Sequence, residues 1–235
     1  MHFSTKSIQH SIMKHITLSM APMFLLIWAC STDGGIPRYL EVPPKNLENV
    51  PKQEQQLPES EYEPAYLVKA GSIRFEASEG MNGSITDSWI QVLHFEDYGR
   101  KERNEIYNQD GVPVHAGFNI GDKYISLDLD EKIANEWEVG DQSGLSNSFD
   151  WYVQRAGGSA YDWGKEIVAG IECDVFYEPI EGGIAKYAGW GNIVFISDFK
   201  SSVWGDYYLG AIEFTEGPVD PKLFQVPEGF TIKKW

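Results

Sequence analysis

The sequence is poor in positive charge. Its 235 residues include 19 Lys and Arg against 35 Asp and Glu, which gives a formal net charge of −16. Nucleic acids and anionic lipid surfaces attract clusters of basic side chains, so this balance excludes both as electrostatic partners. Cysteine is also scarce, because Cys30 and Cys173 are the only two. An apolar content of 42% is ordinary and excludes both a wholly disordered chain and a polytopic membrane protein.

Signatures of metal and catalytic sites are scarce as well. Beyond residue 29 only His94 and His115 remain, and neither has the spacing of a zinc motif. The acids at 128–131 lack the spacing of a calcium loop, and no G-x-S-x-G nucleophile elbow occurs. We expect His94 to be a hydrogen-bonded imidazole in the core or at its rim, and Cys173 to be a buried, inert thiol. The sequence therefore predicts a non-enzymatic protein without a metal or cofactor.

The first 29 residues have the composition of a secretory leader. They contain Lys6, Lys14 and no acid, so the remainder, with 17 basic and 35 acidic side chains, carries −18. The apolar stretch from Ile16 to Ala29 has the length of a signal-peptide core and is too short to span a bilayer comfortably. A buried helix or a retained anchor is the alternative. We expect residues 1–29 to be a signal peptide.

The leader ends in Ile27-Trp28-Ala29-Cys30, which resembles the lipobox of bacterial lipoproteins. In that family the Cys sulfur carries diacylglycerol and the new amino terminus is acylated, so the resemblance implies lipid attachment at Cys30. Two or more acyl chains give stable anchoring. The implied location is the cell envelope, anchored to the outer membrane on its periplasmic or surface side. Ordinary secretory cleavage is the alternative. A lipid-modified Cys30 could not pair with Cys173.

Composition divides the remainder into a tether and a domain. Six of the twelve prolines fall within residues 31–64, and no period of 2 or 3.6 is visible there, so residues 30–65 are predicted to be a polar, Pro-rich tether. Residues 66–235 are predicted to be one β-rich domain. The predicted strands cover 73–77, 84–96, 112–118, 122–129, 166–177, 184–199 (with glycine interruptions) and 203–215.

One helix and several turns complete the expectation. Residues 145–156 are the helix candidate, with Ser146 or Ser148 as the cap and Gly157-Gly158 as the stop. The charged stretch 97–105 predicts an exposed hairpin tip, and Pro227 limits any later strand to an edge or a turn. The fold class is therefore mainly β (α+β): a curled antiparallel sheet, or an unclosed β-barrel, with one or two covering helices.

Aromatic residues are in surplus, at 14% of the chain. They could simply fill the space between the sheet and its helix. Alternatively, some of them line a cavity for an apolar ligand, as in most small-molecule sites. Strand alternation places Trp89, Leu93 and Phe95 on one face, so these three are the predicted ligand-binding residues.

The order of these segments resembles the lipoprotein-sorting carrier superfamily (LolA-like) of Gram-negative periplasms, in particular its uncharacterised Bacteroidetes-type branches. The resemblance covers GSIRFEASEGMNGSITDSWIQVLHFEDYGRKER (71–103), the G-x-x-C step at Gly170–Cys173 and the closing LFQVPEGFTIKK (223–234). It implies an unclosed β-barrel over helices, with a cavity for acyl chains. Because a tethered chain differs from the family's soluble carriers, a stationary acceptor, sensor or scaffold fits better.

Two functions therefore remain open. In the first, the domain holds an apolar ligand such as a lipid or acyl chain under its curved sheet. In the second, the protein's own side chains fill that space, and the domain is a structural or interaction lipoprotein that binds an envelope protein.

Overall fold

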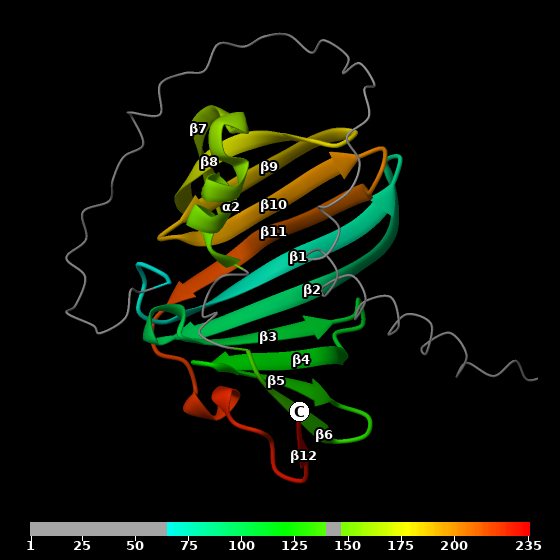
Figure 1. The fold of residues 1–235 in the computed structure, drawn as a ribbon, viewed down its shortest axis with the longest axis vertical. Helices are drawn as coiled ribbons and strands as arrows, with labels where there is room; N and C mark the ends of the chain where they lie inside the picture. Colours follow the sequence, from blue (N-terminus) through cyan, green and yellow to red (C-terminus); the bar gives the residue numbers. More distant parts are fainter. Residues whose placement is uncertain (1–64, 140–146) are drawn as a thin grey trace, which may run out of the picture. The chain divides into compact units, whose positions relative to one another are not determined.

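The computed structural model describes residues 65–139 and 147–235. The expected leader (1–29), Cys30 and the expected tether (30–65) except its last residue lie outside this part of the chain. The described residues form one sheet of 12 strands (Figure 1). The strands are β1 (Gly71–Met81), β2 (Ser84–Glu96), β3 (Lys101–Tyr107), β4 (Pro113–Ile120), β5 (Lys123–Asp128), β6 (Ile133–Glu138), β7 (Tyr161–Val168), β8 (Ile171–Ile180), β9 (Gly183–Trp190), β10 (Ile193–Ser201), β11 (Gly205–Glu216) and β12 (Thr231–Lys234).

The predicted fold class is confirmed: the protein is mainly β, with a mostly antiparallel sheet that does not close into a barrel. Its strand order is β12-β6-β5-β4-β3-β2-β1-β11-β10-β9-β8-β7. The chain runs outward from β1 to β6, returns at the other edge with β7, and works back to β11, which pairs with β1. β12 pairs in parallel with β6 at the sheet edge. The strand after Pro227 is thus an edge strand, as expected.

One predicted strand is wrong, because residues 166–177 form a hairpin. β7 ends at Val168 and β8 begins at Ile171. Between them Ala169 and Gly170 both have positive φ (48° and 81°), which reverses the chain in a tight turn. The reversal places Ile167 in β7 with 65% of its surface exposed, whereas Cys173 lies fully buried in β8.

The predicted helix is confirmed as α2 (Phe149–Ala156). Its N-cap is Ser148, whose Oγ accepts a hydrogen bond from the Trp151 amide at 3.2 Å. Gly157, with φ of 52°, ends it, and a short 3-10 turn follows. α2 lies against β8 and β9 (Figure 1): the ring centroids of Phe149 and Phe176 are 5.6 Å apart, and those of Tyr152 and Tyr187 are 4.6 Å apart. We call the side of the sheet that carries α2 the helix face.

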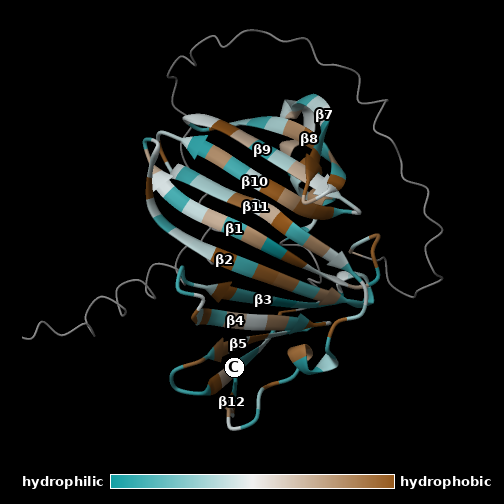
Figure 2. Ribbon diagram, turned by 180° about the vertical axis from the view of Figure 1, so that it is seen from behind, coloured by the Kyte–Doolittle hydropathy of each residue, from teal (hydrophilic) through white to brown (hydrophobic). Residues whose placement is uncertain are grey.

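The opposite side of the sheet is here named the reverse face. One end of it is covered by the chain that follows β11, which we call the C-terminal segment (residues 217–235). Buried side chains from β4, β5 and β6 form a cluster there, against which Val226 and Phe230 pack. Each buried Phe, Ile or Leu side chain of this cluster contributes about 1.5–3 kcal/mol of hydrophobic stabilisation. Apolar and polar residues alternate in bands along many of the strands (Figure 2), as expected where successive side chains point to opposite faces. The buried residues of the cluster under the C-terminal segment are Ala116, Phe118, Ile125, Leu127 and Ala134.

The prediction of an exposed charged tip at 97–105 is wrong for its second half. The chain turns at Asp97–Gly99, but the charged residues that follow belong to β3 and lie inside the sheet. Glu102 is 1% exposed and Arg103 is 9% exposed. Glu102 accepts a hydrogen bond from the hydroxyl of Tyr66, which itself is completely buried. Arg103 is paired with Glu105, so these two buried polar side chains have partners within the fold.

Candidate functional site

A row of six aromatic side chains crosses the helix face. Neighbouring rings lie within contact range along most of the row: 5.0 Å between the centroids of Trp163 and Phe176, 5.2 Å from Phe176 to Tyr187, 5.1 Å from Phe199 to Tyr207 and 6.3 Å from Tyr207 to Trp89. Phe199 also packs against the cluster that contains Tyr187. We name this set the aromatic row: Trp163, Phe176, Tyr187, Phe199, Tyr207 and Trp89, from β7, β8, β9, β10, β11 and β2.

Strand register explains why these residues meet. Phe176 pairs with Tyr187, and Phe199 pairs with Tyr207, so each pair projects from the same face of adjacent strands. β1 lies between β11 and β2, and its residue opposite Trp89 is the small Ala77. A methyl side chain at that position lets the rings of Trp89 and Tyr207 approach each other across the strand.

The two ends of the aromatic row have unpaired hydrogen-bond donors. The indole Nε1 atoms of Trp89 and Trp163 are buried and have no hydrogen-bond partner among the described residues. A buried N–H group without a partner costs about 1–3 kcal/mol, so such groups are rare and call for an explanation. Side chains of α2 pack beside Trp163, whereas Trp89 packs against the neighbouring cluster, which contains no α2 residue.

The three predicted ligand-binding residues share the helix face. In the pairing of β1 with β2, Trp89 lies opposite Ala77, Leu93 opposite Ile73 and Phe95 opposite Gly71. Leu93 and Phe95 are completely buried, and Phe95 makes an edge contact with Tyr66 at 5.2 Å. Trp89 is half-buried. Ligand binding by these residues stays a prediction, and Trp89 alone of the three belongs to the aromatic row.

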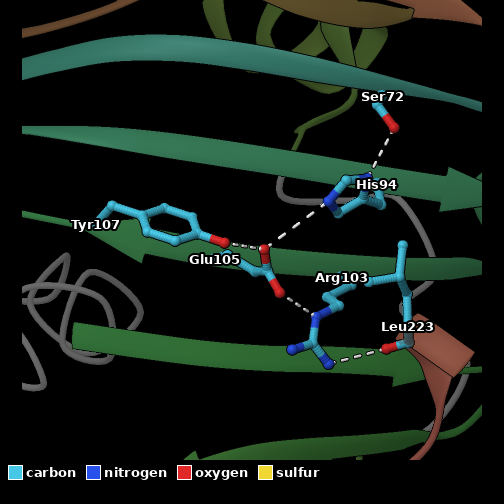
Figure 3. Close-up of polar contacts among 6 residues, drawn as sticks. All are labelled: Ser72, His94, Arg103, Glu105, Tyr107 and Leu223. Atoms are coloured by element: carbon cyan, nitrogen blue, oxygen red, sulfur yellow. Dashed lines mark hydrogen bonds and ion pairs between the residues drawn. The ribbon is translucent and has the colours of Figure 1, made fainter. Parts of the chain in front are cut away.

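A second constellation lies on the reverse face (Figure 3). His94 Nδ1 is 2.7 Å from the Ser72 hydroxyl, and its Nε2 is 3.9 Å from Glu105. Glu105 accepts hydrogen bonds from Tyr107 at 2.5 Å and from Arg103 at 2.6 Å. Arg103 donates in turn to the carbonyl of Leu223 at 2.9 Å, so this network connects β1, β2 and β3 to the C-terminal segment.

The network resembles a nucleophile–base–acid arrangement in composition, but its geometry suits a structural role. The separation of 3.9 Å between His94 and Glu105 is too long for a hydrogen bond. The His94 side chain, followed by Tyr107 and Arg103, holds the pKa of Glu105 at about 2 against the opposing effect of burial, so this carboxylate is a weak base. Ser72 lies within β1, which is paired with strands on both sides.

His94 is hydrogen-bonded in a half-buried position, as the sequence predicts. Its neighbours could not be read from the sequence, because Ser72 and Glu105 come close to it only through the pairing of β1 and β3 with β2. The predicted burial of Cys173 is confirmed, whereas the inertness of its thiol stays a prediction, which the raised pKa of about 12 caused by burial favours. The aromatic row was missed except for Trp89, since it joins six strands spread over more than half of the domain.

Two further observations concern the described residues as a group. Across 65–139 and 147–235, no set of three or more His, Cys, Asp or Glu side chains is arranged to hold a metal ion. The helices within these same ranges are all too short or too polar to cross a membrane.

Comparisons with known proteins give a likeness of fold. No model of a protein family matches the chain, and no curated protein matches it. Among solved structures it is similar to an uncharacterized conserved protein from Thermus thermophilus, with 7% sequence identity and a TM-score of 0.48, over 72% of this chain and 92% of that one. At this level of identity the likeness concerns the backbone arrangement alone.

Proposed function

We propose that this protein is a lipid-anchored protein of the cell envelope that binds an apolar small molecule, such as a lipid or an acyl chain, on the helix face of its sheet. The observation that carries the proposal is the aromatic row, a set of rings from six strands whose ends are the indole donors of Trp89 and Trp163, both without a partner among the described residues. Ligand sites commonly combine an apolar lining with a few polar groups that orient the ligand. The resemblance of residues 71–103 to the lipoprotein-sorting carriers supports the same function.

Binding of a fluorescent apolar probe tests the proposal. We expect N-phenyl-1-naphthylamine to bind the protein saturably and to be displaced by long-chain lipids, and native mass spectrometry of gently purified protein to show a co-purified lipid. Phe199→Leu, in the middle of the aromatic row, should weaken probe binding several-fold, on the order of 1 kcal/mol. Val203→Ala, an exposed change outside the row, is the control. Absence of both probe binding and co-purified lipid would sink the proposal.

A binding role is favoured over a catalytic one. In the reverse-face network, the carboxylate of Glu105 already accepts hydrogen bonds from Arg103 and Tyr107. The thiol of Cys173 has a raised pKa, whereas an activated nucleophile has a lowered one. We expect no hydrolysis of p-nitrophenyl esters that depends on Ser72. Ester hydrolysis that disappears in Ser72→Ala would contradict this assignment.

The alternative is a non-enzymatic interaction lipoprotein whose own side chains fill the helix face. The complete burial of Leu93 and Phe95 favours this second candidate. It would bind an envelope protein instead of a lipid, and the probe experiment separates the two candidates.

The anchor has a separate test. A Cys30→Ser form should lose its acyl label and leave the membrane fraction, because the residue that carries the acyl chains is then missing. Full membrane retention of that form would contradict the proposed lipid attachment.

A further inference from the structure

The end of the aromatic row at Trp89 combines a hydrogen-bond donor with negative charge. Trp89 Nε1 is buried without a partner among the described residues, beside the ring of Tyr207. On the same face of the sheet, Glu79 pairs with Tyr207 on one side and with Asp87 on the other. Two carboxylates therefore flank the point where the aromatic row ends.

The Glu79 carboxylate acts on the end of the row. Burial, the largest cause, and the Glu79 carboxylate both raise the pKa of the Tyr207 phenol, so Glu79 disfavours a negative charge at that ring. The adjoining strand segments supply no compensating charge, because residues 75–81, 84–92 and 205–211 contain no Lys or Arg. A hydrogen-bond acceptor at this position is therefore favoured when it carries no negative charge.

We infer that the ligand of the helix face carries an uncharged carbonyl, as in an ester or amide, at the end of its apolar chain, and that this carbonyl accepts a hydrogen bond from Trp89 Nε1. This inference rests on the proposed function and specifies its ligand class. The carbonyl removes the cost of the unpaired indole donor, while the chain extends along Tyr207 and Phe199. A free fatty acid, which is ionised above neutral pH, meets Glu79 and Asp87 and binds more weakly.

The Trp163 end of the row is a poorer place for that carbonyl. Its ring stacks on Phe176 and belongs to the cluster that includes Phe149 and Ala156 of α2. Side chains of the helix therefore already occupy the surroundings of Trp163. Trp89 packs instead with residues of the sheet, and its neighbour Tyr207 is only half-buried.

Three ligands of equal chain length test the inference by displacement of N-phenyl-1-naphthylamine. They are methyl dodecanoate, dodecyl methyl ether and dodecanoate, measured above neutral pH. The wild-type protein should bind the ester more tightly than the ether or the carboxylate. Trp89→Phe keeps an aromatic ring but removes the donor, and should weaken ester binding by about five- to tenfold while ether binding is unchanged. Trp204→Phe, at an exposed tryptophan outside the aromatic row, is the matched control and should show no such selective loss.

The charge is tested separately. Glu79→Gln should narrow the gap between ester and carboxylate by about two- to fivefold, because one repelling charge is removed. Glu131→Gln, at the exposed turn before β6, is the control for an equal change of net charge. Glu79→Gln also keeps the inference testable if Trp89→Phe fails to fold, which circular dichroism would reveal.

The outcomes separate the inference from the function beneath it. If none of the three ligands displaces the probe and the probe itself does not bind, the proposed function falls and the inference falls with it. If all three bind equally, or if Trp89→Phe weakens ester and ether alike, the apolar function stands and the carbonyl assignment is overturned.

Discussion

At the scale of single residues, Glu105 has the clearest electrostatic role. It receives hydrogen bonds from Arg103 and Tyr107 and lies near His94, with its side chain 13% exposed. These neighbours lower its pKa from 4.5 to about 2. A depressed folded pKa means that the ionised carboxylate stabilises the fold above the unfolded value, and that this contribution disappears as pH falls through the folded value.

The loss of free energy of unfolding caused by Glu105→Gln should therefore depend on pH. We expect a loss of about 1–3 kcal/mol in the free energy of unfolding at neutral pH, which shrinks as pH falls from 4.5 toward about 2. Urea unfolding at several pH values measures it. The exposed Glu131→Gln should show no such trend. A loss that is constant down to low pH would show that Glu105 acts through packing.

Cys173 supplies a chemical prediction at the same scale. Burial raises its pKa to about 12 and removes it from solvent, so the native thiol should resist alkylation by iodoacetamide. In denaturant it should react at the rate of an ordinary cysteine. Peptide mapping by mass spectrometry distinguishes it from Cys30. Rapid labelling of Cys173 in the folded protein would contradict its burial.

Residue roles were predictable from sequence where they depend on local pattern. Alternation along one strand was enough to place Leu93 on an apolar face, and the only two histidines outside the leader drew attention to His94. Arg103 could not be assigned, because its carbonyl partner in Leu223 is 120 residues away. Composition alone led to the prediction that the charged stretch around Arg103 is an exposed hairpin tip.

At the scale of elements, Asn192 joins a hairpin turn to the helix. It lies between β9 and β10 with φ of 62°, and its Oδ1 accepts hydrogen bonds from the Asp150 amide at 2.7 Å and the Ser148 hydroxyl at 3.2 Å. Its Nδ2 donates to the carbonyl of Ala65 at 2.6 Å. One side chain thus fixes the start of α2 and the approach of the chain to β1.

Two substitutions separate the conformational and hydrogen-bonding roles of Asn192. Asn192→Gly keeps access to positive φ but loses three hydrogen bonds, and should lower the free energy of unfolding by about 1–3 kcal/mol. Asn192→Ala should cost about 1 kcal/mol more through backbone strain. Urea denaturation measures both. Asn82→Gly, in the exposed β1–β2 turn with φ of 54°, is the control and should be nearly neutral.

The residues at turns and helix ends also explain which elements could be predicted from the sequence. The interruptions at Gly189 and Gly191 marked a break within 184–199, and Ser148 with Gly157 bounded the helix. The hairpin between β7 and β8 was missed because its first turn residue is Ala169, which rarely adopts positive φ. An apolar alternation that continued from Ile167 to Val175 across the turn concealed the reversal.

At the scale of the whole sheet, the described residues have two separate outer cores. One lies on the helix face, where Phe176 packs with α2 and β9. The other lies on the reverse face, where Phe118 packs with β5 and the C-terminal segment. The two share no residue, and the central strands β1, β2 and β11 connect them. Sequence periodicity predicted β1, β2, β4, β5 and β11 but not β3 or β6, and it could not show that opposite faces are buried at opposite ends of the sheet.

This division predicts local effects on hydrogen exchange. Phe118→Leu should speed amide exchange about tenfold in β4, β5 and β6 and leave β8 and β9 unchanged, because a loss of about 1–2 kcal/mol stays within the unit that the side chain stabilises.

The matched change in the other core is Phe176→Leu, which should have the converse effect. Both side chains are at most 1% exposed, so the two substitutions remove similar contacts from different cores. Hydrogen exchange read by mass spectrometry resolves the strands. Equal acceleration throughout the sheet in both variants would contradict the division, because it would mean that the twelve strands open as a single cooperative unit.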